Sequence, residues 1–162
     1  MKPTASLSRF DRVFNVVADR ARDPALLFLR VVWGWMFFQT GLGKLMNLER
    51  TTEFFASLGL PMPFANALFV GTLELVGGLL LVGGLWGRKV AFLLLGNMVV
   101  AYLTAHTDAF GSLRAFTGAE PNAFLVASCV VFAFGPGRWS IDAWRQRSSR
   151  SENVTIAQSA RA

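Results

Sequence analysis

Four long apolar segments limit how this chain can fold more than any other feature. They span residues 24–45, 64–86, 90–105 and 121–139. The first two have the roughly 20 residues that a helix needs to cross the hydrocarbon core of a bilayer, and the last two are shorter. Such segments must be helical in lipid, because a helix satisfies its backbone hydrogen bonds internally. The pattern predicts an all-α membrane protein, built as a bundle of four transmembrane helices.

The composition excludes other classes of basic protein. Of the 162 residues 53% are hydrophobic and 16% are charged, and the net charge is +6. A soluble domain of this composition would expose a large apolar surface. The cations lie at both ends and in one short loop, which argues against nucleic-acid binding. The one cysteine, Cys129, and the one histidine, His106, rule out an internal disulfide and a haem with two histidine ligands, and no metal site is expected.

The N-terminal segment, residues 1–23, differs from the apolar spans. Between residues 6 and 22 apolar side chains recur at helical spacing among arginines. This pattern predicts an amphipathic helix that lies on the membrane surface. The dipeptide Asp23-Pro24 is typical of a helix start, with Asp23 as N-cap and Pro24 at the first helical position.

Residues 24–144 form the predicted membrane domain, and residues 145–162 form a polar tail. We expect the part of the tail after Arg147 to be disordered. Twelve Lys and Arg residues lie in the two terminal segments and in the turn between the second and third spans. Three lie in the other two loops. The positive-inside rule therefore places both termini and the tail in the cytoplasm.

Two charged residues lie deep in the predicted spans, Arg30 in the first and Glu74 in the second. A carboxylate at the bilayer midplane costs about 2.5–3.5 kcal/mol on insertion scales, so Glu74 should face protein. Counted from the ends of the spans, the two residues differ in depth by about 6 Å, which predicts an ion pair between them. The pair either fixes the helix register or forms part of a site for proton transfer or for a quinone carbonyl. A protonated, unpaired Glu74 is the third alternative.

More polar residues gather near the outer ends of the spans. We expect them to line an outer-side polar cleft together with Arg30 and Glu74: Gln39, Lys44, His106 and Asp108. Taken one by one, Lys44 also fits a cation that snorkels at a helix end, and His106 fits an interfacial histidine.

Glycines recur one heptad apart in the first two spans, as Gly34 and Gly41 and as Gly77 and Gly84. Small residues at such spacing let membrane helices approach closely. They predict close helix packing.

Four stretches carry a family resemblance. They are RVVWGWMFFQTGLGKL (Arg30–Leu45), FFASLGLPMP (Phe54–Pro63), LELVGGLLLVGGLWGR (Leu73–Arg88) and GPGRWSIDAW (Gly135–Trp144). In this order they resemble the signatures of the DoxX family of bacterial membrane proteins, over roughly residues 25–144. The resemblance implies a four-helix protein of the bacterial inner membrane. It also implies an oxidoreductase subunit, because some relatives resemble the membrane part of a thiosulfate:quinone oxidoreductase. The matched positions are Arg30, Lys44, Glu74 and Arg88.

Two functional hypotheses follow. In the first, the chain is the membrane subunit of a quinone-linked oxidoreductase: the cleft receives a quinone, and a soluble or membrane partner supplies electrons, because the sequence has no CxxC motif. In the second, the chain is a non-catalytic membrane scaffold or a small-solute permeation subunit. The sequence does not decide whether the chain is an enzyme or forms a homo-oligomer.

The topology can be tested with reporter fusions. Fusions after Phe10 and after Arg150 should report the cytoplasm, and fusions near Thr52 and Gly111 should report the external side. A cytoplasmic signal from Thr52 would contradict the arrangement of four spans.

Overall fold

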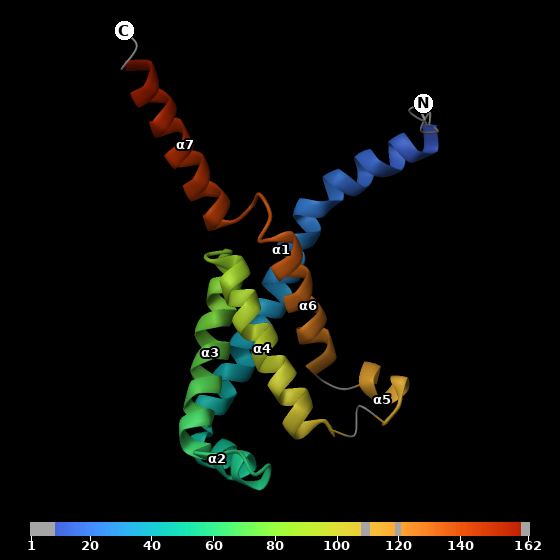
Figure 1. Cartoon of the computed structure of the whole chain (residues 1–162), viewed down its shortest axis with the longest axis vertical. Coiled ribbons are helices and arrows are strands. Elements are labelled where there is room, and N and C mark those ends of the chain that lie inside the picture. Colours follow the sequence, from blue (N-terminus) through green and yellow to red (C-terminus); the bar gives the residue numbers. More distant parts are fainter. Residues whose placement is uncertain (1–8, 108–110, 119–120, 160–162) are drawn as a thin grey trace, which may run out of the picture.

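The computed structural model describes residues 9–107, 111–118 and 121–159, and within these ranges it contains helices and no strand. The helices are α1 (Arg9–Met46), α2 (Leu48–Ser57), α3 (Pro63–Gly83), α4 (Gly87–Ala105), α5 (Leu113–Gly118), α6 (Pro121–Phe134) and α7 (Ile141–Ser159). Figure 1 shows α1, α3, α4 and α6 as a bundle, with α2 and α5 at one end. The all-α prediction is confirmed for the described residues.

Three segments are long and apolar enough to cross a membrane: Phe14–Met46 of α1, all of α3 and all of α4. Helix α6 is also apolar but has 14 residues, so its role as a fourth span stays a prediction. Large apolar side chains on the outside of the bundle are exposed, such as Phe28 (71%), Phe69 (63%) and Phe92 (58%). Such a surface suits lipid better than water.

The predicted helix start at Asp23-Pro24 is wrong. Helix α1 begins at Arg9 and runs through Pro24 to Met46. The Asp23 carboxylate accepts a hydrogen bond from the backbone N–H of Arg138 at 3.1 Å, and it also lies 4.0 Å from the Arg138 Nε. Asp23 therefore has a tertiary partner instead of a cap role. In the predicted surface helix over residues 6–22, residues 9–22 form the first part of α1, and residues 6–8 lie outside the described residues. The position of this segment on the membrane surface stays a prediction.

The prediction of disorder after Arg147 is also wrong over most of that segment, because α7 covers Ile141–Ser159. The Ser140 hydroxyl accepts a hydrogen bond from the backbone N–H of Ala143 at 3.1 Å. This is the geometry of a helix N-cap, which a reading of the tail's polarity alone overlooks. Figure 1 shows α7 and the N-terminal part of α1 diverging from the same end of the bundle.

Helices α1 and α3 are antiparallel and pack closely through glycines. A Cβ added to Gly34 would lie 2.8 Å from the carbonyl oxygen of Gly78. A Cβ added to Gly41 would overlap the backbone N of Leu75 and lie 2.7 Å from the carbonyl oxygen of Gly71. A side chain at either position would push the two helices apart, so these glycines set the distance and the register between α1 and α3.

The other two glycines singled out in the sequence lie elsewhere. Gly77 faces α4, where an added Cβ would meet the Leu94 side chain at 3.3 Å. Gly84 is the C-cap of α3, with φ at 66°, a left-handed conformation that favours glycine. The partners of α1 are Gly71 and Gly78, a pair also seven residues apart in α3.

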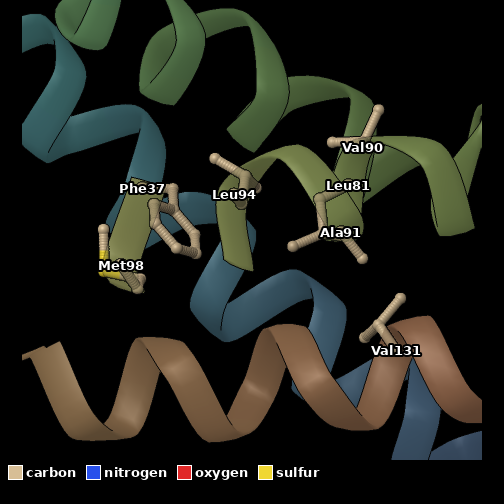
Figure 2. Packing of buried hydrophobic residues seen from close by; sticks show 7 residues of the cluster. All are labelled: Phe37, Leu81, Val90, Ala91, Leu94, Met98 and Val131. Carbon is tan, nitrogen blue, oxygen red and sulfur yellow. The ribbon is translucent and has the colours of Figure 1, made fainter. Parts of the chain in front are cut away.

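An apolar core lies between the four bundle helices. Figure 2 shows its buried members, from α1, α3, α4 and α6: Phe37, Leu81, Val90, Ala91, Leu94, Met98 and Val131.

Gly41→Ala should lower the free energy of unfolding by about 1–3 kcal/mol, because the new Cβ would meet the backbone of α3. Gly43→Ala is the matched control, since an added Cβ there has no atom within 4 Å. The control should leave stability unchanged or raise it slightly, as alanine favours helix. Melting temperatures in one detergent compare the two variants, and equal values would contradict the proposed interface.

Candidate functional site

A cavity of about 420 Å³ lies between α1, α2, α3, α4 and α6. Most of its wall is apolar and includes four aromatic rings, those of Phe37, Phe54, Phe55 and Phe124. The polar side chains at its surface are Thr40, Lys44, Asn66, Glu74, Asn97, Thr104 and His106. Pockets of this size, apolar with a few polar groups, are typical small-molecule sites.

Glu74 has two side-chain partners at the cavity. The Lys44 ammonium forms a salt bridge with Oε2 of Glu74. The Asn97 side-chain amide donates a hydrogen bond to Oε1 at 2.9 Å. The Glu74 side chain is 3% exposed and that of Lys44 is 29% exposed. The charge of Glu74 is therefore neutralised where it is buried, and the network joins α1, α3 and α4.

Arg30 lies at the opposite end of the bundle, 1% exposed. Its guanidinium donates hydrogen bonds to the carbonyl oxygens of Pro136 and Trp139, the latter at 2.8 Å. It also packs against Gly84, where an added Cβ would overlap it. Gly84 is ten residues beyond Glu74, about 15 Å along α3.

The predicted ion pair of Arg30 and Glu74 is therefore not formed, and Arg30 does not line the cavity. The predicted depths of Arg30 and Glu74 were counted from the ends of the apolar segments. The glycine contacts set a different register, in which Lys44 lies beside Glu74. Arg30 instead donates hydrogen bonds to backbone carbonyl oxygens just after the C-terminal end of α6.

A second set of hydrogen bonds lies at the same end of the bundle as Arg30. The Asp142 carboxylate accepts hydrogen bonds from the backbone N–H groups of Trp86 and Gly87, each at 2.9 Å. The backbone N–H of Asp142 donates to the carbonyl oxygen of Gly84 at 3.2 Å. The start of α7 is thus hydrogen-bonded to the turn between α3 and α4. These bonds give the GPGRWSIDAW stretch a structural role.

The outer-side residues predicted from the sequence separate into three groups. Lys44 and His106 line the cavity, and the His106 ring lies 6.3 Å from the Tyr102 ring. Gln39 is exposed and is not part of the cavity wall. Asp108 lies outside the described residues.

Asn97 is the functional candidate that sequence reasoning missed. It lies in the third apolar segment, residues 90–105, which contains no charged residue. The sequence does contain a signal for Asn97, because an amide side chain within a membrane span commonly forms a hydrogen bond to another helix. The aromatic wall had no comparable signal, since phenylalanines occur throughout the spans. Among the residues that the structure describes, no group of three His, Cys, Asp or Glu side chains could hold a metal ion.

The chain matches the DoxX family over residues 25–107. It belongs to the DoxX family. The matched range of this DoxX-family chain contains Lys44, Glu74 and Asn97, and it ends before Pro136 and Asp142.

Three relatives extend the match over most of the chain. "Putative oxidoreductase CatD" of Bacillus subtilis is 32% identical over 139 residues, which cover 85% of this chain and 98% of the relative. "Inner membrane protein YphA" of Escherichia coli is 30% identical over 129 residues, 75% of this chain and 91% of the relative. "Uncharacterized membrane protein Rv3486" of Mycobacterium tuberculosis is 30% identical over 139 residues, 79% and 84% of the two chains. No solved structure matches. With its span-length helices, this chain is a membrane protein of the DoxX family.

Lys44→Met should lower the free energy of unfolding by about 3 kcal/mol, because it leaves a buried carboxylate without its cation. Glu74→Gln should cost less, since the partly exposed Lys44 can reach water. Replacing both by Met should restore part of the stability lost in Lys44→Met.

The control is Arg50→Met, which replaces an exposed cation that forms no ion pair among the described residues and lines neither pocket. Thermal melts in detergent measure all four variants. If Lys44→Met and Arg50→Met have the same melting temperature, the salt bridge does not stabilise the bundle.

Proposed function

We propose that this chain is the membrane subunit of a quinone-linked oxidoreductase system, and that the cavity beside Glu74 receives the quinone ring. The observation that carries the proposal is an aromatic-walled cavity of about 420 Å³ that ends at the network of Lys44, Glu74 and Asn97. A ligand for such a cavity is largely apolar and carries a few hydrogen-bonding groups. A quinone has this chemistry.

The polar network can serve both redox states of a quinone. A lysine ammonium has three N–H donors, and Lys44 uses one of them on Glu74. Another is available to a quinone carbonyl oxygen. The Asn97 amide donates to Glu74, so its own oxygen is left to accept a hydrogen bond from a quinol hydroxyl.

The reaction needs electrons and protons from outside the ring. Reduction of a quinone to a quinol takes two electrons and two protons, and a redox partner protein supplies the electrons. Within the chain, Glu74 and Lys44 are placed to pass protons at the ring, and His106 lines the same cavity. The printed name of the Bacillus subtilis relative, "Putative oxidoreductase CatD", agrees with a redox role.

A second function is a non-catalytic scaffold or a small-solute permeation subunit. One observation favours a structural role: the Glu74 carboxylate uses both of its oxygens to join α1 and α4 to α3. In this alternative the cavity is empty of quinone, and the network only fixes the helices.

Purified protein discriminates the two functions. Organic extraction followed by chromatography should recover quinone from the wild-type protein, and at least tenfold less from Lys44→Met and Glu74→Gln. Gln39→Leu is the control, because Gln39 is a polar residue outside the cavity wall.

The variants must first be shown to be monodisperse, so that lost quinone is not lost folding. Wild-type protein without quinone, which also fails to take up added quinone, would favour the scaffold. Equal retention by the Gln39 and Glu74 variants would place the quinone elsewhere.

A further inference from the structure

A second hollow, of about 810 Å³, lies at the opposite end of the bundle from the Glu74 cavity. It is lined by the N-terminal half of α1, the start of α4, the end of α6 and the start of α7. In Figure 1 this is where α1 and α7 diverge. Its lining includes four cations: Arg22, Arg88, Lys89 and Arg138.

The cations of this hollow have much unused hydrogen-bonding capacity. Arg22 and Arg88 each donate to a carbonyl oxygen at the end of α6, that of Phe134 at 3.3 Å and that of Ala133 at 3.5 Å. A guanidinium has five N–H donors, so most remain available. Lys89 is exposed and forms no ion pair among the described residues.

Two of the three carboxylates in the same lining already have hydrogen-bond partners. Both oxygens of Asp142 accept backbone N–H groups. Asp23 accepts the backbone N–H of Arg138 and lies at salt-bridge distance from its guanidinium. The third carboxylate, of Asp19, is exposed. Four cations and three carboxylates leave an excess of one positive charge around a space large enough for a ligand.

Exposed tryptophans beside the hollow support a position at the depth of lipid headgroups. Trp86 is in its lining and is 55% exposed, and Trp139 and Trp144 of the adjoining segment are 59% and 67% exposed. Indole rings prefer the membrane–water interface. Phe134, also in the lining, is 55% exposed and offers an apolar surface beside the cations.

We propose that this hollow binds the phosphate group of an anionic phospholipid, held by Arg22, Arg88, Lys89 and Arg138. Arginine matches phosphate geometry with paired N–H donors, and basic pockets between membrane helices hold anionic headgroups in this way. The lipid would connect α1, α4 and the segment between α6 and α7, which meet at this end of the bundle. The site is separate from the quinone cavity and does not depend on it.

The test uses the purified full chain in detergent, titrated with dioctanoyl phosphatidylglycerol and followed by tryptophan fluorescence. Arg88→Gln with Lys89→Gln should weaken binding about 30-fold, at the usual contribution of a cation near a lipid phosphate. The control is Arg50→Gln with Arg114→Gln, which removes the same charge from exposed positions at the other end of the bundle. It should bind as the wild-type protein does.

Several results would overturn the proposal. Equal weakening in the two double variants would reduce the effect to net charge, and unchanged binding by the Arg88 and Lys89 variant would remove the site. Equal binding of dioctanoyl phosphatidylcholine would show that the anionic headgroup is not recognised. Displacement by millimolar inorganic phosphate would assign the hollow to a soluble anion. If the double variant does not fold, Arg22→Gln should bind about fivefold more weakly, and unchanged affinity would again refute the site.

Discussion

The close contact between α1 and α3 is the constraint on which the other features of the bundle depend. Gly34 and Gly41 lie against Gly78 and Gly71. A Cβ at Gly34, Gly41 or Gly78 would collide with backbone, and one at Gly71 would collide with the Leu45 side chain. The contact fixes which residues of the two helices are level with each other. A slip of one helical turn would move Lys44 about 5 Å along α3 and away from Glu74. The salt bridge is thus a consequence of backbone packing as much as of charge.

The same register separates the two deeply buried charges. Glu74 meets an ammonium group and an amide at one end of the bundle, and Arg30 meets two backbone carbonyls at the other. Apolar side chains, among them Phe37, Leu81 and Leu94, fill the core of the bundle. Each charged group has polar partners beside it. These partners matter because water cannot stabilise a charge that is buried in a low-dielectric interior. The bundle therefore has the Glu74 cavity at one end, and the hydrogen bonds between α7 and the α3–α4 turn at the other.

The sequence predicted the positions of the helices better than it predicted the contacts between them. The apolar segments became helices, because a lipid-compatible run of this length has no other way to satisfy its backbone. Local signals were overruled where a tertiary partner existed: Asp23 binds Arg138 and does not cap a helix. The partner of Glu74 was misassigned because depth was measured from segment ends, whereas register is decided by glycine contacts between helices. Asn97 was visible as an amide in an apolar run, but its bond to Glu74 follows only from that register.

The role of the Glu74 carboxylate depends on the hydrogen bonds that its partner, Lys44, can still form. A salt bridge that only holds helices together could be replaced by apolar side chains with little loss of stability. This one borders a cavity, and its lysine is 29% exposed whereas its carboxylate is 3% exposed. The lysine can therefore turn part of its hydrogen-bonding capacity toward a ligand while the carboxylate stays buried. In the proposed quinone site, a carbonyl that draws on Lys44 would weaken its hold on Glu74, so ligand binding and the α1–α3 register would influence each other through a single ammonium group.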